Sequence, residues 1–364
     1  MNRVALVGAR GHGASYFDRL DRLAAAGRAR LVAVADPRPP GPLAPRLSGV
    51  TWHDSLADLL AQVEPEVVVL ATPVHTHAEL AVAAMRAGCD VLLEKPPAPS
   101  FAEFSQVLAA ARETGRICQV GFQTFGSEAI EAVRQIVADG EIGTVTGYGA
   151  VGTWVRTAGY WARSEWAGHR RLGGRDVVDG VVTNPLAHAV ATALLVAGAS
   201  VTHVETDLYR ANDIEADDTS SGVVTLSDGL RLGFGFTLCA PRRSPALVLV
   251  HGSKGTARLA YESDTVDVDD RTMTFGRVDL LEDLLTARET GSRPRCPVED
   301  TAAFMHVVEA VREAEPPTKI ADHHIRWSGD GDDRHPVVTD VEAWCSRAAV
   351  RGKTFSSLGA PWAR

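Results

Sequence analysis

Glu94, Lys95 and Pro96 are the residues of this chain whose position most strongly suggests chemistry. They follow the apolar run Cys89 to Leu93, which predicts a buried strand of a parallel sheet. A lysine and a glutamate at the end of a buried strand are energetically costly unless they serve a purpose there. Because open α/β sheets bind ligands at the carboxyl ends of their strands, we expect Lys95 to bring an ionisable amine to a ligand site.

A glycine-rich turn near the N-terminus indicates what this ligand is. An apolar strand expected over residues 3–7 is followed by Gly8-Ala9-Arg10-Gly11-His12-Gly13 and then by a helical pattern. A second expected strand, over 30–35, ends in Asp36, at the separation typical of the acid that binds the adenosine ribose. Strand, turn, helix and acid together favour a dinucleotide site, with Glu94 and Lys95 beside it, over a plain tight turn before a surface helix.

The turn departs from the usual G-x-G-x-x-G at one position. Arg10 replaces the second glycine, which normally lets the backbone approach the pyrophosphate. Gly11 is expected to take over this close approach, with Arg10 turned outward or toward a phosphate. Asp36 should repel a 2′-phosphate, whereas Arg38 can reach one. The sequence therefore favours NAD and leaves NADP open.

A third strand and helix place more residues at the expected cofactor site. Thr72 and Pro73 follow an apolar run over 65–71 and would edge the nicotinamide ribose. His75 and His77 lie near the start of the next helix, where a histidine is more often a cap or a packing residue, so we expect them to be cofactor neighbours at most. Gln123 ends the last strand of this half, expected over 119–123, and is also assigned to the cofactor site.

These motifs, in this order and at these spacings, resemble the Gfo/Idh/MocA oxidoreductases, the group of glucose-fructose oxidoreductase and inositol dehydrogenase. The motifs are GARGHG, ADP, ATPVHTHAEL and EKPPAPS, and the closing GKTFSSLGAPWA resembles one branch of the family. The resemblance implies a cis peptide between Lys95 and Pro96. It also implies a homodimer or homotetramer that forms through the C-terminal sheet.

The expected fold class is α/β, with two domains. Residues 1–122 are expected to form a Rossmann domain with a doubly wound parallel sheet, and residues 123–364 an α+β domain with a large, mostly antiparallel sheet. Strand-like runs with few helices support the second domain, at residues 145–151, 201–209, 222–226, 230–238, 247–251 and 256–260. A helix is expected over 127–139. Another, over 300–313, and the C-terminal segment are expected to pack back on the first domain.

A second group of candidate catalytic residues lies at the start of an apolar helix. His188 is expected in its first turns, with Asn184 one turn earlier on the same side. The family commonly has an aspartate where this chain has Asn184, and an amide can orient a substrate hydroxyl but cannot act as a base. Proton chemistry is therefore assigned to Lys95 and His188. The alternative makes His188 a hydrogen-bonded core residue.

The segment 153–171 combines tryptophans, a tyrosine and arginines without a clean helical or strand period. Aromatic faces pack on sugar C–H surfaces, and arginines donate to hydroxyl or carboxylate oxygens. Tyr160, Trp161, Arg163 and Trp166 are therefore expected to bind substrate. In the alternative, Trp154 and Trp161 only fill the domain interface.

Composition narrows the class of protein. The net charge of −9 disfavours binding to nucleic acid, and no apolar run is long enough to span a membrane. An expected strand at residue 3 leaves no room for a signal peptide. The 5 cysteines are scattered without metal-type spacing, which predicts a reduced cytoplasmic protein without a metal.

The resulting prediction is an NAD(P)-dependent oxidoreductase that transfers a hydride between the nicotinamide and a carbinol carbon of a sugar, cyclitol or related polyol. Two alternatives remain. One is an NAD-retaining glycosidase or lyase that uses transient oxidation, and the other is a non-enzymatic sensor of cofactor or sugar. The presence of both Lys95 and His188 speaks against a sensor, since binding alone needs neither.

Overall fold

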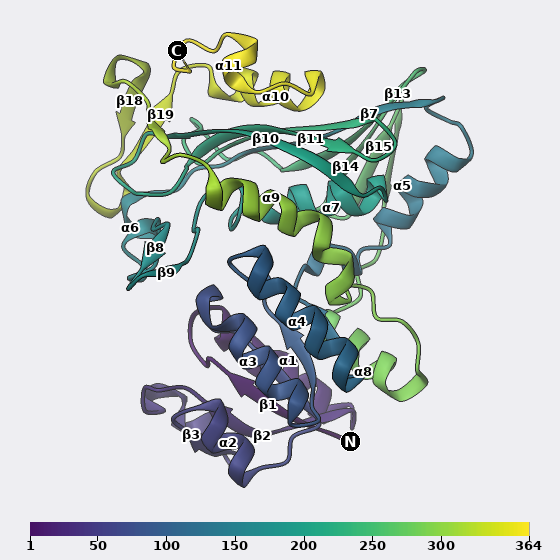
Figure 1. Cartoon of the computed structure of the whole chain (residues 1–364), viewed down its shortest axis with the longest axis vertical. Helices are drawn as coiled ribbons and strands as arrows, with labels where there is room; N and C mark the ends of the chain where they lie inside the picture. The colour runs from purple at the N-terminus through teal and green to yellow at the C-terminus, as the bar shows by residue number, and fades with distance from the viewer. Residues whose placement is uncertain (364) are drawn as a thin grey trace. The chain divides into compact units, whose positions relative to one another are not determined.

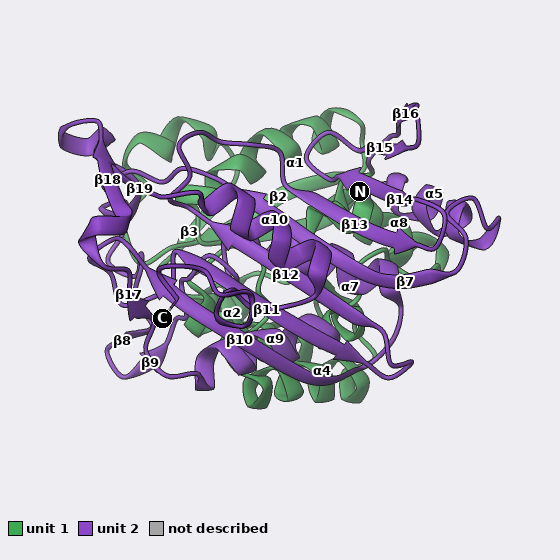
Figure 2. Ribbon diagram, turned by 90° about the horizontal axis from the view of Figure 1, so that it is seen from above, with its two compact units in different colours: residues 1–126, 278–301 green, residues 127–277, 302–364 purple. Residues whose placement is uncertain are grey.

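The computed structural model describes residues 1–363, which form two compact units (Figures 1 and 2). Unit 1 comprises residues 1–126 and 278–301, and unit 2 comprises residues 127–277 and 302–364. The chain first passes from unit 1 to unit 2 after residue 126, a few residues beyond the expected boundary at 122. The segment that returns to unit 1 is 278–301, whereas the helix expected over 300–313 and the C-terminal segment belong to unit 2. Hydropathy shows that a helix has an apolar face but not which sheet this face covers.

Unit 1 contains a six-stranded parallel sheet with the strand order β3-β2-β1-β4-β5-β6. The strands are β1 (Asn2–Val7), β2 (Ala29–Ala35), β3 (Thr51–His53), β4 (Val67–Leu70), β5 (Asp90–Leu93) and β6 (Cys118–Val120). Every residue of β4 and β5 is buried, as expected for inner strands covered on both faces. The order reverses between β1 and β4, which is the doubly wound Rossmann arrangement that the sequence predicted.

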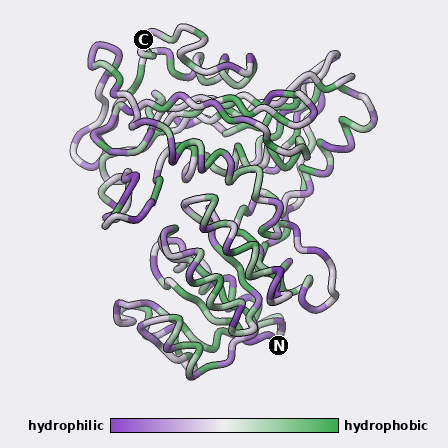
Figure 3. Tube along the Cα trace, in the orientation of Figure 1, coloured by the Kyte–Doolittle hydropathy of each residue, from purple (hydrophilic) through white to green (hydrophobic). Residues whose placement is uncertain are grey.

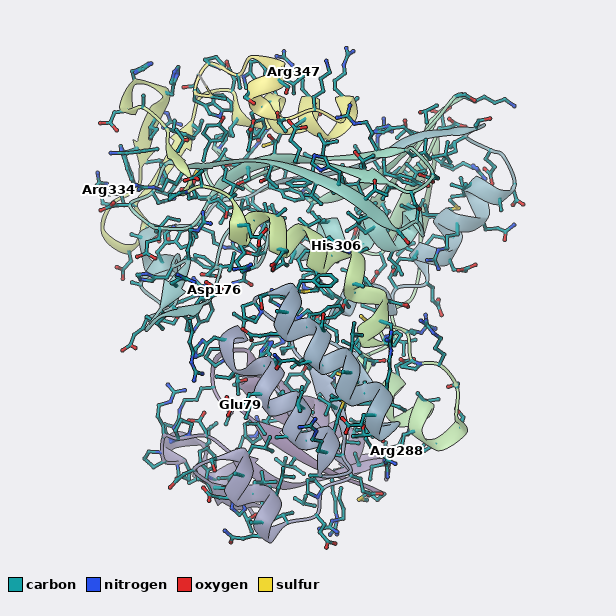
Figure 4. All side chains as sticks on the ribbon, viewed as in Figure 1. Glu79, Asp176, Arg288, His306, Arg334 and Arg347 are labelled. Carbon is teal, nitrogen blue, oxygen red and sulfur yellow. The ribbon has the colours of Figure 1, made fainter. Side chains whose placement is uncertain are left out.

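The helices of unit 1 are α1 (Ser15–Ala25), α2 (Leu56–Gln62), α3 (His77–Arg86), α4 (Phe101–Thr114) and α8 (Leu280–Thr290). Three of these five, α2, α4 and α8, begin directly after a residue whose side chain caps the helix. Ser100 caps α4 by accepting from the Glu103 backbone N–H at 3.2 Å, and Gly115 ends the helix with φ of 63°. Arg288 of α8, labelled in Figure 4, donates to Asp90 at 2.5 Å and to Glu66 at 2.9 Å, which holds residues 278–301 on this unit.

Unit 2 is built on a nine-stranded mixed sheet with the order β16-β15-β14-β13-β7-β12-β11-β10-β17. The strands are β7 (Val145–Thr153), β10 (Val201–Arg210), β11 (Thr219–Leu226), β12 (Arg231–Thr237), β13 (Leu247–Gly252), β14 (Thr256–Ala260), β15 (Thr265–Val268), β16 (Arg271–Thr274) and β17 (Thr318–Lys319). Only the pairs β7–β12 and β10–β17 are parallel. The sheet is therefore mostly antiparallel, as expected, although the sequence analysis missed the β15–β16 hairpin.

Short elements and helices complete unit 2. The helices are α5 (Ala129–Ala138), α6 (Ala158–Trp161), α7 (Ala187–Ala197), α9 (Ala302–Glu313), α10 (Val341–Arg351) and α11 (Phe355–Leu358). Two hairpins are formed by β8 (Arg171–Leu172) with β9 (Arg175–Asp176), and by β18 (Ile325–Ser328) with β19 (His335–Val338). Figure 3 shows hydrophilic residues gathered around the β8–β9 hairpin.

Helices of the same chain cover both faces of the large sheet. In Figure 1, α10 and α11 lie on one side of it, and α7 and α9 lie on the other. Glycines make the close contacts possible. A Cβ atom at Gly235 of β12 would lie 2.3 Å from the Cys345 carbonyl oxygen of α10, and one at Gly152 of β7 would lie 2.5 Å from the Leu186 side chain before α7. A larger residue at Gly235 would therefore push α10 off the sheet.

Candidate functional site

The glycine turn after β1 has the geometry of a dinucleotide-binding turn. Gly8 has φ of 83°, and its Cα lies against the end of β4, where a Cβ would be 2.4 Å from the Ala71 carbonyl oxygen. Gly13 is equally constrained, because its Cβ would be 1.8 Å from the Gly8 carbonyl oxygen. Gly11 has φ of 57° and open space where its Cβ would be. The first and last glycines therefore pack the turn, and Gly11 leaves room above it.

The Arg10 side chain is not turned outward, because its guanidinium contacts Asp36 at 2.7 Å and donates to the Pro39 carbonyl at 2.5 Å. The expected contact with a phosphate stays a prediction. Asp36 is only 2% exposed and also accepts from the backbone N–H groups of Ala9 at 3.1 Å and Arg38 at 3.0 Å. The strong carboxylate acceptor at the end of β2 explains this orientation, since it attracts the nearest guanidinium.

The ionisation of Asp36 is decided by its donors. Burial opposes ionisation, but the backbone N–H groups of Arg38 and Ala9 outweigh it, together with the Arg38 and Arg10 side chains, so that the pKa of Asp36 is lowered. The Arg38 Nε lies 3.3 Å from the carboxylate. Two guanidinium groups therefore offset the charge that would repel a 2′-phosphate.

Glu94 lies at the centre of a buried hydrogen-bond group at the end of β5. Its Oε1 accepts from the Tyr16 hydroxyl at 2.6 Å and lies 2.9 Å from His12 Nε2, and its Oε2 accepts from the Lys95 backbone N–H at 3.3 Å. Gly121 makes room for it, because a Cβ there would lie 3.0 Å from Oε2. This group connects the glycine turn and α1 to the strand that precedes Lys95.

The pKa of Glu94 shows that this carboxylate is charged at neutral pH. Burial alone would raise its pKa, but the hydrogen bond and charge of His12, the Tyr16 hydroxyl and the charge of Lys95 lower it to about 2. A carboxylate can only accept hydrogen bonds, so His12 Nε2 must carry a proton. The pKa of Tyr16 is raised well above its ordinary value, first by burial and then by Glu94, so Tyr16 remains a donor.

The loops after β4 and β5 are joined next to Lys95. The Lys95–Pro96 peptide is cis, as the resemblance implied. His77 is 1% exposed and bridges the Pro96 and Thr72 carbonyl oxygens, so it is neither a cap nor a simple packing residue. Pro73 precedes the short 3₁₀ turn Val74–Thr76 that leads into α3. Gln123 was expected to end the last strand, but β6 ends at Val120 and Gln123 instead begins the short 3₁₀ turn Gln123–Gly126.

In unit 2, Asn184 and His188 lie at the entrance of α7. His188 is in the first turn of the helix, and its ring lies 6.3 Å from that of Tyr261. Asn184 precedes the helix rather than lying one helical turn earlier, because the chain from Gly180 to Leu186 forms a series of tight turns. Its side-chain amide donates to Asp179 Oδ1 at 2.5 Å.

Asp179 is the residue of this region that the sequence analysis did not single out. It is 3% exposed, and its Oδ2 accepts from the Gly168 backbone N–H at 2.8 Å and from Arg163 at 3.2 Å. A carboxylate therefore does lie beside Asn184, although it belongs to Asp179 and not to position 184, where the family commonly has an aspartate. The signal in the sequence was an aspartate followed by a glycine shortly before an apolar helix. Only glycine fits at position 180, because a Cβ there would lie 1.7 Å from Asp217.

The proposed substrate residues form a stack of arginines and aromatic rings. The Arg163 guanidinium lies 3.7 Å from the Tyr160 ring centre and 4.7 Å from that of Trp166. The Arg156 guanidinium also lies over the Tyr160 ring, 4.7 Å from its centre. Trp161 packs edge-on against Tyr160 with ring centres 5.0 Å apart. These contacts bring all four predicted substrate residues together.

Trp161 also lines a cavity within unit 2. The cavity measures about 870 Å³, and its wall includes Gly168, Arg170, Arg210, Ile214 and Pro317. Gly168 connects it to the Asp179 group, because its backbone N–H donates to Asp179. Trp161 of the stack and Gly168 of the Asp179 group therefore both line a cavity of a size that holds small ligands.

Three further features can be stated for the described residues. No helix within residues 1–363 is both long enough and apolar enough to span a membrane. Over the same range, no group of three or more His, Cys, Asp or Glu side chains is arranged to hold a metal ion. All five cysteines are buried free thiols, as the sequence predicted.

Two domain families match the chain. The oxidoreductase family with an NAD-binding Rossmann fold, GFO_IDH_MocA, matches residues 2–122, and the GFO/IDH/MocA C-terminal domain matches residues 130–258. Inositol 2-dehydrogenase of Streptomyces avermitilis is 34% identical over 144 residues, which are 38% of this chain and 41% of the relative. 4-Carboxy-2-hydroxymuconate-6-semialdehyde dehydrogenase of Sphingobium is 28% identical over 140 residues, 38% of this chain and 44% of the relative. The chain therefore spans less than half of these two curated relatives.

A solved structure resembles the fold over most of its length. The WlbA dehydrogenase from Bordetella pertussis, in complex with NADH and UDP-GlcNAcA, matches with a TM-score of 0.72 and 22% sequence identity, covering 85% of this chain and 95% of that one. The two matched domains together cover most of the chain, and the Rossmann sheet, glycine turn and Glu94-Lys95-Pro96 segment agree with them. The chain therefore belongs to the Gfo/Idh/MocA family of oxidoreductases with an NAD-binding Rossmann fold.

Proposed function

We propose that this protein is an NAD-dependent dehydrogenase that oxidises a CH–OH group of a sugar, cyclitol or related polyol. The observation that carries the proposal is the arrangement at the carboxyl edge of the parallel sheet. There the glycine turn after β1, Asp36 after β2, Thr72 after β4 and Lys95 after β5 all follow strand ends. Ligands of open α/β sheets bind at this edge, next to the reversal of strand order.

The chain's own residues fit a dinucleotide. Gly11 leaves open space above the turn, and Gly8 and Gly13 allow the close packing that such a turn requires. Asp36 supplies a carboxylate for the adenosine ribose, and Arg10, His12, Arg38, Thr72, Pro73, His77, Glu94 and Gln123 are proposed to complete the cofactor site. When bound, the nicotinamide accepts the hydride that leaves the carbinol carbon.

The proton chemistry is proposed for Lys95 and His188. As the hydride leaves, the C–O bond becomes a carbonyl and the hydroxyl proton must pass to a base. Lys95 Nζ is proposed to take this proton, with His188 sharing it. Asn184 is proposed to orient a neighbouring substrate hydroxyl, because its amide is already held by Asp179.

The substrate class follows from the proposed binding residues and from the relatives. Tyr160, Trp161, Arg163 and Trp166 offer ring faces and guanidinium donors, which suit a polyol with apolar C–H faces and many hydroxyls. One relative is named for inositol, and the solved WlbA complex contains UDP-GlcNAcA. These names support a cyclic polyol or sugar substrate.

Self-association and location are proposals as well. A homodimer or homotetramer through the C-terminal sheet would bring a partner against α10 and α11 rather than against bare strands, because these helices cover that face. Val350 of α10 is 51% exposed, so Val350→Glu should disrupt an assembly that uses this face. Light scattering after size-exclusion chromatography measures the effect. A reducing cytoplasm is proposed from the five buried free thiols.

One experiment tests the proposed function and separates it from its rivals. Purified protein is screened by thermal shift against NAD, NADP and a panel of sugars, sugar acids and cyclitols, and NADH absorbance is followed with each stabilising compound. Net NADH formation with a polyol supports the proposal. A product without net NADH indicates an NAD-retaining glycosidase or lyase. Binding without any product indicates a sensor.

A further inference from the structure

His77 has an unusual set of hydrogen-bond partners. Its Nδ1 lies 2.7 Å from the Pro96 carbonyl oxygen, and its Nε2 lies 2.8 Å from the Thr72 carbonyl oxygen. The ring is 1% exposed, so water does not supply another partner. Both ring nitrogens therefore face atoms that can only accept hydrogen bonds.

This geometry determines which protons the ring carries. A neutral imidazole has one N–H group and one bare lone pair, so it can donate to only one of the two carbonyl groups. In the neutral form, the other nitrogen would hold a lone pair against a carbonyl oxygen inside the protein, which is repulsive. Only the imidazolium donates in both directions, and distances of about 2.7–2.9 Å are typical of charge-assisted N–H···O bonds.

The charges around His77 act in both directions. Burial lowers its pKa, because it removes water from the charged form, and His75 acts in the same sense. The hydrogen bonds to the Pro96 and Thr72 carbonyl oxygens and the charge of Glu94 favour the protonated form. Glu94 is ionised at neutral pH and is the counter-charge available to a buried imidazolium. Together these effects lower the pKa of His77, with burial as the largest cause. The geometry nevertheless favours the charged ring, since it alone donates to both carbonyl oxygens.

We propose that His77 is a positioning residue for Lys95, which it serves as a doubly protonated bridge between the loops after β4 and β5. Pro96 follows Lys95 directly, so a bond to its carbonyl oxygen holds the turn that carries the amine. Thr72 lies at the end of β4, on the side assigned to the nicotinamide ribose. The role in catalysis rests on the proposed function, whereas the protonation state of the ring does not.

The protonation state can be measured on the unmodified protein. Histidine labelled with ¹⁵N reports each ring nitrogen separately, and the His77 signals are identified by their loss in His77→Gln. Both nitrogens should remain protonated at a pH of about 7.5, one unit above the ordinary histidine pKa of about 6.5. If the variant does not fold, neutron diffraction of the wild-type protein locates both protons directly. A single proton on the ring at that pH would overturn the proposal.

The positioning role predicts a specific kinetic change. His77→Gln should lower kcat by about tenfold to a hundredfold, because a misplaced catalytic group reacts less often. The Kd for NADH should change less than kcat does, because the buried ring acts on the cofactor site only through the Thr72 loop. His53→Gln is the matched control, since His53 is also buried in unit 1, at 7% exposure, and contacts Thr51 on the edge strand β3. The control should leave kcat unchanged.

The outcomes separate this proposal from the proposed function. An equal loss of kcat in His77→Gln and His53→Gln would show a general effect of destabilisation and would overturn the positioning role. If no polyol yields NADH, the proposed function fails, and the ring measurement alone then decides whether His77 bridges the two loops as a cation.

Discussion

The buried carboxylates of unit 1 and the arginine–aromatic stack of unit 2 hold charge in different ways. In unit 1, the carboxylates of Asp36 and Glu94 are 2% and 7% exposed, and a few defined donors hold each of them. In the stack of unit 2, guanidinium groups lie on the ring of Tyr160. Arg163, for example, keeps 26% of its side chain exposed. The neighbouring Asp179, by contrast, is buried and held by defined donors like the carboxylates of unit 1.

The two arrangements should differ in how strongly a single substitution affects the protein. A buried carboxylate that loses a donor keeps a desolvation cost without compensation, so a single change should have a large effect. A guanidinium over a ring contributes about 0.5–1 kcal/mol at exposed sites, and neighbouring arginines contact the same rings. The buried carboxylates should therefore respond sharply to the loss of a donor, and the cation–ring contacts of the stack should respond gradually.

Replacement of the proposed base should have the largest effect. Lys95→Ala and His188→Ala are each expected to lower kcat by about a hundredfold to ten-thousandfold, because general acid–base groups typically contribute that much. The melting temperature and the Kd for NADH should stay near their wild-type values. Lys254→Ala is a control that removes a lysine from unit 2. A near wild-type rate for Lys95→Ala with the true substrate would contradict the proposed mechanism.

The buried Glu94 should make stability depend on acid pH. Its pKa of about 2 lies below the ordinary value of 4.5, so ionised Glu94 stabilises the fold above pH 4.5 by about 3 kcal/mol, and this contribution is lost as the pH falls from 4.5 toward 2. Urea unfolding at several pH values measures it.

Glu94→Gln should remove most of this acid dependence while keeping the shape of the side chain. Tyr16→Phe should remove only part of it, because the contact with His12 remains. An unfolding free energy that depends on pH equally in wild type and Glu94→Gln would show that other carboxylates are responsible.

Replacement of Asp36 should have a more moderate effect, and this effect should be on cofactor preference. Asp36→Ala should weaken NAD binding by about tenfold, since a hydrogen bond to a charged group contributes about 1.5–3 kcal/mol, part of which water replaces. The same change leaves Arg10 and Arg38 without their carboxylate partner, so NADP should bind more tightly than before. Calorimetry with both cofactors measures this. Wild-type protein that binds NADP at least tenfold more tightly than NAD would refute the ribose assignment.

The smallest effect is expected in the stack of unit 2. Trp166→Ala should raise the KM for substrate several-fold and change the melting temperature little, because its contact with the Arg163 guanidinium lies at a partly exposed site. Arg163→Ala should also raise the KM, but it should lower the melting temperature as well, because it removes a donor from the buried Asp179 carboxylate. If Trp166 instead stabilises the fold, loss of a buried aromatic ring should cost about 3–5 kcal/mol. A large drop in the melting temperature of Trp166→Ala with unchanged kinetics would therefore contradict the substrate assignment.

Local pattern was sufficient for most of the secondary structure. The runs expected at 145–151, 201–209, 247–251 and 256–260 are strands with bounds within two residues of those observed. The β15–β16 hairpin was missed, because each strand is only four residues long and β16 has a single apolar residue, Met273, which is only partly buried. The alternation of polar and apolar side chains is a property of each segment alone, so it is sufficient to predict strands such as the four that agree.

The candidate site also has one part that the sequence predicts and another part that depends on tertiary contacts. The amino-acid sequence by itself determined the glycine turn, Asp36, Lys95 and the family, because these depend on residue types at short spacings. Only the tertiary structure showed that Arg10 turns to Asp36, that Tyr16 and His12 hold Glu94, and that Asp179 holds Asn184. Most of these contacts join segments that are far apart in the chain, and a hydrogen bond of this kind depends on position in space rather than on spacing in sequence. The same reason applies to His77, whose two carbonyl partners come from different loops.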